Sequence, residues 1–365
     1  MEKRGQVAME FLMTYGWAIL IILIAVGALW MLGVFSPSTP ANCSLEAPFS
    51  CDDVFISQHG ISFLISSNVE SATVSSVEVD GEPCHVALPL SSISKGSSKV
   101  VCNGLNLEEG EAISGKILLN YKKPGGFSHP VEGAFTGEVK KLTIGLVDVG
   151  VCTATVPNCF NWWKTELEDK GFKVEKLVPE DLDTFEEISE YSVILNTGGE
   201  TYPEVSNDRT VSNNIRKFIH KGGFWFEAGA ASFYYPSCRS STCSSIGFGS
   251  PQGYVCLGMV FDVGSTTRNL APQGQQILPT GMPSSISDLG MKRLSSNTYN
   301  PNNLPECNND PQYFNLYTDT TAGSTYSGLA MHCYGKGCLV RTDVGTSNEL
   351  EPVVDIYSEL FHFGS

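Results

Sequence analysis

Residues 191–230 read YSVILNTGGETYPEVSNDRTVSNNIRKFIHKGGFWFEAGA, and this stretch alternates two kinds of pattern. The run 191–196 is mostly apolar and short, which is typical of a buried strand. Val211, Ile215, Phe218 and Ile219 then recur at helical spacing, and two glycines at 222 and 223 end the pattern. A second apolar run follows at 224–228. The stretch therefore predicts two parallel strands joined by a helix.

The same alternation extends over residues 141–365. Further strand patterns lie at 143–149, 172–178 and 337–341, and helical stripes lie at 160–167 and 353–361. Alternating strands and helices predict a mostly parallel sheet covered by helices on both faces. We therefore expect a three-layer α/β domain over 141–365.

Three motifs in this region carry a resemblance to class I glutamine-amidotransferase-like domains, which have a flavodoxin-like α/β fold. They are ILNTGG at 194–199, IRKFIHKGG at 215–223 and FEAGAAS at 226–232. In that family the last motif is a strained turn that exposes a catalytic cysteine. The resemblance aligns Gly229 with the cysteine and leaves Glu227 in a degenerate turn. Because glycine has no nucleophilic side chain, the family's acyl transfer is not expected here.

Ligands on open parallel sheets bind beyond the carboxyl ends of the strands. Two interpretations stay open for the polar residues there: a pocket for a cation or a sugar, or carboxylates that are simply solvated. No cofactor and no metal site are predicted. The residues at these strand ends are Asp148, Gly198, Gly199, Glu200 and Glu227.

Residues 37–140 have a different sequence pattern, which predicts short strands and no amphipathic helix. Runs 61–65 and 76–79 alternate or nearly alternate, and 113–121 place apolar residues on one face with a period of two. Turn-forming dipeptides such as Asp80-Gly81 and Asn103-Gly104 separate the runs. Short strands with regular turns predict an immunoglobulin-like β-sandwich.

Residues 11–35 contain no charged side chain. A helix of this length rises about 37 Å, enough to cross a hydrocarbon core of about 30 Å. Lys3 and Arg4 precede the segment, so the positive-inside rule predicts a cytoplasmic N-terminus and extracellular domains. A cleaved secretory signal is the alternative, but its apolar part is usually about 7–15 residues long.

The residues before this segment, KRGQVAMEF at 3–11, resemble the class III signal of archaeal pilins and archaellins. The resemblance implies that a prepilin peptidase removes a leader of residues 1–5 by cutting between Gly5 and Gln6. The hydrophobic helix, residues 6–36, would then stay on the mature protein in the membrane lipid or a filament core. Glu10 would become its fifth residue, where the family's carboxylate neutralises the terminal amine of a neighbouring pilin subunit.

The twelve cysteines indicate disulfides and a compartment outside the cytoplasm. Zinc is the alternative, but no CxxC motif occurs. We expect close pairs at 43/51, 152/159, 238/243 and 333/338 and a further pair at 84/102, although four cysteines in the sandwich allow three pairings. Asn42 begins a glycosylation sequon. The cysteines are Cys43, Cys51, Cys84, Cys102, Cys152, Cys159, Cys238, Cys243, Cys256, Cys307, Cys333 and Cys338.

A formal net charge of -16 argues against a nucleic-acid partner, because phosphate binding needs clustered cations. The patterns favour a cell-surface pilin-like protein, of the minor pilin or adhesin type, whose catalytically inactive α/β domain binds a glycan or a surface. Two alternatives remain: a membrane-tethered extracellular hydrolase, and a solute-binding protein that uses the same processing route. A complete catalytic set would favour the hydrolase, and tight ligand retention without self-assembly would favour the solute-binding protein.

Overall fold

The computed structural model describes most of the chain. The described residues are 15, 17, 19–27, 40–58, 60–83, 85–86, 92–103, 105, 107–150, 159–198, 201–204, 209–228, 233, 235–236, 255–256, 259–261, 266–288, 291–293, 304–307, 312–318, 326–327, 329–342 and 347–362. Two compact units divide the chain at Pro40/Ala41.

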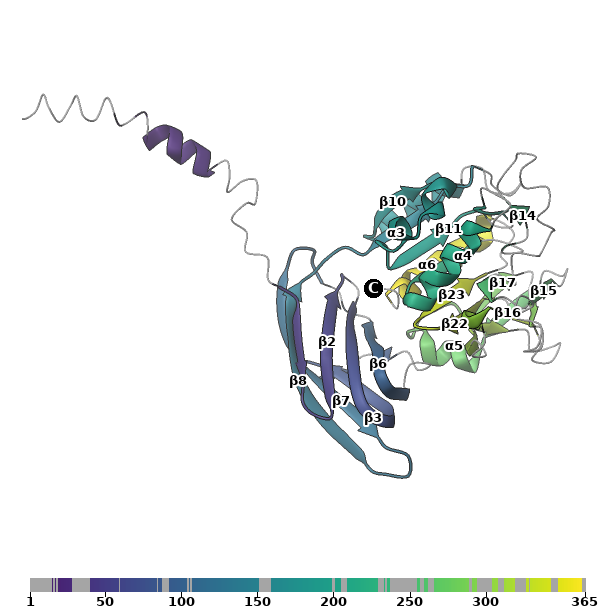
Figure 1. Cartoon of the computed structure of the whole chain (residues 1–365), viewed down its shortest axis with the longest axis horizontal. Helices are drawn as coiled ribbons and strands as arrows, with labels where there is room; N and C mark the ends of the chain where they lie inside the picture. The colour runs from purple at the N-terminus through teal and green to yellow at the C-terminus, as the bar shows by residue number, and fades with distance from the viewer. Residues whose placement is uncertain are drawn as a thin grey trace, which may run out of the picture. The chain divides into compact units, whose positions relative to one another are not determined.

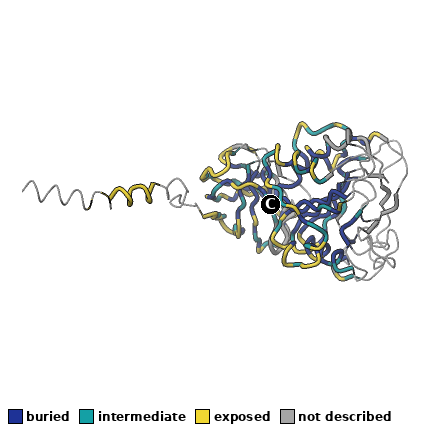
Figure 2. The backbone as a smooth tube through the Cα atoms, turned by 90° about the horizontal axis from the view of Figure 1, so that it is seen from above, coloured by how far each residue is buried: buried dark blue, intermediate teal, exposed yellow. Residues whose placement is uncertain are grey.

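In the first unit, residues 15, 17 and 19–27 are α-helical, and all of them are exposed (Figure 2). Among the residues that the structure describes, no helix meets the length and apolarity needed to cross a bilayer. Most of the predicted span 11–35 lies outside those residues, together with Gly5, Gln6 and Glu10. The membrane-spanning helix therefore stays a prediction.

The second unit begins with an antiparallel sheet of eight strands (Figure 1). Its hydrogen-bonded path is β1-β8-β7-β3-β6-β5, and β2 and β4 pair with β3 off this path. The strands are β1 (Asn42–Leu45), β2 (Phe49–Ile56), β3 (Gly60–Val79), β4 (Glu82–Pro83), β5 (His85–Val86), β6 (Ser92–Asn103), β7 (Ala112–Lys122) and β8 (Ser128–Glu138).

An antiparallel β-domain is thus confirmed, but its strands do not form the two separate sheets of the expected immunoglobulin-like sandwich. The reason is strand β3, which is 20 residues long and joins both halves. Its first part pairs with β2 and β6, and its last part, 73–79, pairs with β7. The ladders shift register at 67/71 and 74/76, and such bulges bend a strand. One bent strand therefore replaces two of the strands that the alternating runs predicted.

The α/β part is built on a sheet of seven strands in the order β10-β9-β11-β13-β23-β22-β19 (Figure 1). The first five are parallel, and β22 and β19 continue the sheet antiparallel. The mostly parallel sheet is thereby confirmed. The strands are β9 (Thr143–Val147), β10 (Lys173–Leu177), β11 (Val193–Asn196), β13 (Phe224–Glu227), β19 (Gln312–Asn315), β22 (Ala330–Tyr334) and β23 (Gly337–Arg341).

Helices cover both faces of this sheet, because the strands are apolar on both sides. In β13, Phe224 and Phe226 face one core and Trp225 faces the other. The first core includes residues of α2 (Cys159–Asp169) and α6 (Ser347–Phe361). The second includes residues of the 3₁₀ helix η2 (Pro179–Asp183), α3 (Phe185–Ile188) and α4 (Thr210–Lys221).

Between β13 and the last strands lies an antiparallel sheet that the sequence patterns did not predict. Its order is β15-β18-β21-β20-β16-β17, and a separate parallel pair joins β12 to β14. Strand β12 (Thr201–Tyr202) comes earlier in the chain, after β11. The other elements are β14 (Tyr235–Pro236), β15 (Met259–Phe261), β16 (Thr266–Leu270), α5 (Pro272–Ile277), β17 (Ser285–Asp288), β18 (Met291–Arg293), η6 (Pro305–Cys307), β20 (Tyr317–Thr318) and β21 (Tyr326–Ser327).

Disulfides form in both parts of the second unit. The bonds Cys43–Cys51 and Cys333–Cys338 confirm two predicted pairs. Cys256–Cys307, which closes 51 residues, was not predicted. Cys102 is also disulfide-bonded. The pairs 84/102, 152/159 and 238/243 each include a cysteine outside the described residues, so these pairings stay predictions.

Candidate functional site

The candidate site is the carboxyl edge of the parallel sheet. The strand order β10-β9-β11-β13-β23 reverses direction between β9 and β11. In open α/β sheets such a reversal leaves a crevice beyond the strand ends, and ligands bind there. Asp148, Gly198 and Glu227 follow or end β9, β11 and β13, so the topology brings these three predicted residues to one edge.

Glu227 is the most perturbed acid at this edge. Its side chain is fully buried at the end of β13. One oxygen of its carboxyl group accepts a hydrogen bond of 2.6 Å from Trp225 Nε1, and the other accepts one of 2.8 Å from Asn196 Nδ2. Burial raises the pKa of Glu227 to about 8, against the lowering effect of these two hydrogen bonds. The carboxyl group is therefore mainly neutral at pH 7.

The hydrogen bonds around Glu227 connect three other elements to the end of β13. Its backbone carbonyl accepts a 2.5 Å hydrogen bond from the Tyr357 hydroxyl on α6. Asn196, in register with Glu227 on β11, also donates to the Thr201 carbonyl at 3.0 Å. Its side-chain oxygen accepts from the Gly198 amide at 3.2 Å. Strands β11 and β13, the segment after β11 and helix α6 thus meet at one buried polar cluster, which we call the Glu227 cluster.

Asp148 behaves differently, because it is half-buried and has a cationic partner. Burial opposes its ionisation, but a 2.7 Å bond from Lys176 Nζ and a 2.9 Å bond from the Gly150 amide outweigh burial. The pKa of Asp148 is consequently lowered. At neutral pH, Asp148 is a carboxylate neutralised by Lys176.

Gly198 sits where a side chain does not fit. A Cβ at this position would lie 2.5 Å from the Thr201 carbonyl oxygen and 2.5 Å from Val149 Cγ2. The close approach holds the segment after β11 against the end of β9.

We expect Gly198→Ala to lower the free energy of unfolding by about 2 kcal/mol, as overpacking does in dense regions. Gly126→Ala is the matched control, because its nearest neighbour is at 3.4 Å. Urea unfolding followed by circular dichroism measures both. Equal effects of the two substitutions would contradict the close packing at Gly198.

Other predicted residues of the site are not in the described structure. Gly199, Glu200 and Gly229 lie outside the described residues, and so do residues 230–232 of the expected nucleophile turn. The five-residue pocket therefore stays a prediction. Among the described residues, no group of three or more His, Cys, Asp or Glu side chains is placed to hold a metal.

Sequence reasoning missed several buried polar groups near this edge. The Glu204 carboxylate, fully buried, accepts from the Ser212 amide at 3.2 Å and hydroxyl at 2.9 Å at the start of α4. Tyr202 is also fully buried, and burial followed by the Glu204 charge raises the pKa of its phenol. Arg341, in register with Glu227 on β23, is fully buried as well. A polar residue at the end of a buried strand was the available signal for Asn196 and Arg341.

The Glu227 cluster has a structural role and offers no group to a ligand. Both oxygens of Glu227 are occupied by protein donors, and the side chain has no exposed surface. The cluster therefore fixes the ends of β11 and β13 relative to each other.

No family model matches the chain, and no curated protein matches it. Solved structures show a distant similarity. One is a catalytic mutant of Gan42B, a GH42 β-galactosidase from G. stearothermophilus, with 12% identity and a TM-score of 0.35 over 62% of this chain and 30% of that one. Another is the exo-β-1,4-mannosidase Op5Man5 from Opitutaceae bacterium strain TAV5, with 11% identity and a TM-score of 0.32 over 61% of this chain and 35% of that one. This chain thus matches about a third of the length of each, and the likeness is too distant to carry an argument about function.

Proposed function

We propose that this chain is a pilin-like protein of the cell surface, a minor pilin or adhesin, whose α/β domain binds an extracellular ligand without catalysis. The observation that carries the proposal is the helical segment of residues 15, 17 and 19–27, whose large apolar side chains are all exposed. Such a surface needs lipid or other helices around it. The exposed residues are Tyr15, Trp17, Ile19, Leu20, Ile21, Ile22, Leu23, Ile24 and Val26.

The disulfides support an extracellular location for the second unit. Cys43–Cys51, Cys256–Cys307 and Cys333–Cys338 are distributed over both the antiparallel and the α/β parts. Disulfides persist in oxidising surroundings and are rare in the cytosol. Asn42, at the predicted sequon, is exposed, which suits glycosylation.

The raised pKa of Glu227 is the one observation that favours a hydrolase, because a neutral carboxylic acid donates protons. Two facts weigh against this use: the side chain is fully buried, and its oxygens are held by Trp225 and Asn196. The resemblance to amidotransferase-like domains also aligns Gly229 with the family's nucleophile. We therefore propose binding rather than catalysis, with the pocket expected beside Asp148, Gly198, Gly199 and Glu200.

Protease treatment of intact cells tests the location. We expect external protease to digest a C-terminal epitope on the full chain and to leave a cytoplasmic marker intact. A variant that lacks residues 2–36 is expected to stay inside the cell, protected and unbound to membrane. Protection of the epitope on the full chain, or equal digestion of both forms, would contradict the proposal.

A further inference from the structure

The turn between β7 and β8 presents an aromatic ring to solvent. It comprises residues 123–127, with the sequence KPGGF. Phe127 is 87% exposed, the highest value among the large apolar side chains that the structure describes. Gly125 has a φ of 71°, a conformation that glycine adopts without strain, and this lets the chain reverse over a few residues. Single exposed apolar residues are common on protein surfaces, so the surroundings of Phe127 decide what it means.

The hairpin is cationic although the chain is strongly acidic. Residues 112–131 include three lysines and no acidic residue, whereas the whole chain has a formal net charge of -16. Lys122 and Lys123 are exposed beside the turn, and neither forms an ion pair in the described part of the chain. On the neighbouring strand, Thr73 pairs with Lys122, and Glu70 is the one acidic residue within four positions of Thr73. The lysines outnumber it, so the turn keeps a net positive charge.

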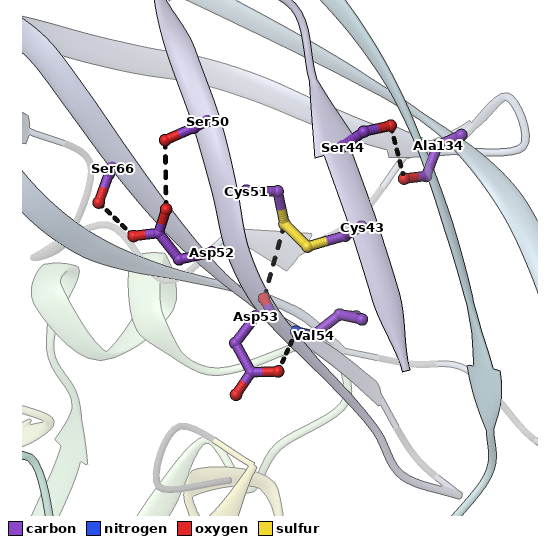
Figure 3. The surroundings of a disulfide bond; sticks show 9 residues. All are labelled: Cys43, Ser44, Ser50, Cys51, Asp52, Asp53, Val54, Ser66 and Ala134. Atoms are coloured by element: carbon purple, nitrogen blue, oxygen red, sulfur yellow. Dashed lines mark hydrogen bonds between the residues drawn. A yellow bond between two sulfur atoms is a disulfide. The ribbon is translucent and has the colours of Figure 1, made fainter. Parts of the chain in front are cut away.

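The base of the hairpin is held firmly by the rest of the antiparallel domain. Every residue of β7 pairs with β8, without a register shift. Strand β8 also pairs with β1, and Ser44 Oγ donates to the Ala134 carbonyl at 3.5 Å (Figure 3). The disulfide Cys43–Cys51 then links β1 to β2 (Figure 3). Because the frame is already ordered, a contact at the turn costs little further ordering.

The composition of the turn distinguishes between kinds of partner. A stable protein interface usually buries about 800 Å² on each side around an apolar centre. Besides Phe127, the described part of the second unit exposes one large apolar side chain, Leu64, to 38%. A soluble polyanion would attract the lysines and leave the ring in water. An anionic bilayer suits both, because an aromatic ring enters the boundary between headgroups and acyl chains while lysines attract the headgroups.

We propose that the β7–β8 turn is a docking site for an anionic lipid bilayer. Phe127 enters the headgroup boundary, and Lys122 and Lys123 lie at the level of the lipid phosphates. The next acidic residue on β8, Glu132, is four residues from Ser128, or about 13 Å along a strand. Charges farther apart than about 8 Å are largely screened at physiological ionic strength. The lysines therefore dominate the attraction at the surface and orient the domain with its turn toward the lipid.

Co-sedimentation with vesicles tests the docking on the full chain. The chain is held in nanodiscs of phosphatidylcholine and mixed with vesicles of phosphatidylcholine alone or of an equal mixture with phosphatidylserine. We expect binding to be about 25-fold stronger to the anionic vesicles, because each lysine near such a surface contributes about fivefold. Soluble polyglutamate is the comparison, and it is not expected to replace the vesicles.

Hydrogen exchange reads contact with the bilayer of the disc itself. In discs that contain phosphatidylserine, the amides of residues 122–128 are expected to exchange more slowly than in phosphatidylcholine discs. If exchange were the same in both discs and the vesicles showed no preference, the docking site would be ruled out.

Matched variants locate the contact in both assays. Phe127→Ser is expected to weaken binding at least tenfold, as loss of a buried aromatic side chain does. Lys122→Gln/Lys123→Gln is expected to reduce binding to the level of the neutral vesicles. The control Lys116→Gln/Lys140→Gln removes the same charge elsewhere in the domain and is expected to change binding by less than about twofold. All of these positions are exposed, so the changes remove no buried packing.

Two results would contradict the lipid contact. If Phe127→Ser bound as well as the wild type, or if polyglutamate displaced the vesicles, the turn would attract anions in general and would not dock on a bilayer. The turn belongs neither to the apolar helix nor to the α/β edge. A chain that stays in its disc but fails these tests would therefore leave the proposed function standing.

Discussion

Replacing Glu227 by Gln is expected to remove a pH dependence of stability. In the wild-type protein the Glu227 contribution makes the free energy of unfolding fall between about pH 4.5 and pH 8. The pKa of Glu227 is raised from 4.5 to about 8 in the folded protein. Within this window the folded chain keeps a proton that the unfolded chain has lost. Stability therefore falls as the pH rises, by up to about 1.4 kcal/mol per pH unit, and the contribution is fully present only below about pH 4.5. The glutamine side chain has no proton to lose and escapes this dependence.

Chemical unfolding of both proteins at several pH values measures the effect as a difference. We expect the free energy of unfolding of Glu227→Gln, relative to the wild type, to rise steadily up to about pH 8 and to stay constant above it. Glu175→Gln is a control of opposite sign. The hydrogen bond from Lys173, followed by the one from Tyr191, lowers the pKa of Glu175, so its contribution to stability is present above about pH 4.5 and is lost as the pH falls below it. A constant difference between wild type and Glu227→Gln would show that Glu227 is not buried as a neutral acid.

The second prediction concerns the exposed apolar helix. Replacing both Ile22 and Leu23 by Arg is expected to abolish stable membrane association of the full chain. Each arginine at the centre of a membrane helix costs about 3 kcal/mol on insertion scales, or roughly a hundredfold in partition. Ile22 and Leu23 are 59% and 63% exposed, so the change removes no packing within the described residues. Fractionation of cell membranes after alkaline wash measures the result.

Phe127→Arg supplies the control for this experiment. Phe127 is 87% exposed in the turn between β7 and β8, and its replacement adds a charge to the second unit instead. We expect this variant to stay in the membrane fraction. If the helix variant also stayed there, the apolar segment would not be the anchor.

Much of the α/β core was predictable from the sequence, because buried parallel strands are continuous apolar runs between turn signals. The pattern at 337–341 matches β23 residue for residue, and the patterns at 191–196 and 224–228 contain β11 and β13. The helical stripes of α4 and α6 were equally clear, since each buries one face. The approach of Asp148, Gly198 and Glu227 to one sheet edge followed from the parallel order alone.

The remaining features depend on contacts between residues far apart in the chain or on burial, and a local sequence pattern predicts neither. The six-stranded sheet at 259–327 consists of strands of two to five residues, too short to show a period. Cys256 and Cys307 are 51 residues apart, and spacing gives no reason to pair them. Likewise, the neutral state of Glu227 arises from burial beside Trp225 and Asn196, which a sequence does not display. Strand β3 was divided into two runs because its bulges interrupt the alternation.

The most direct test of the central claim is the intact mass and N-terminal sequence of the native membrane-associated protein, with and without reduction. We expect a chain that begins at Gln6, keeps its apolar segment and gains about two hydrogens per reduced disulfide. Three of the disulfides, Cys43–Cys51, Cys256–Cys307 and Cys333–Cys338, would contribute to that gain. A chain that begins near Asn42 would identify an ordinary secreted protein, and the pilin-like anchor, including any role of Glu10, would be wrong.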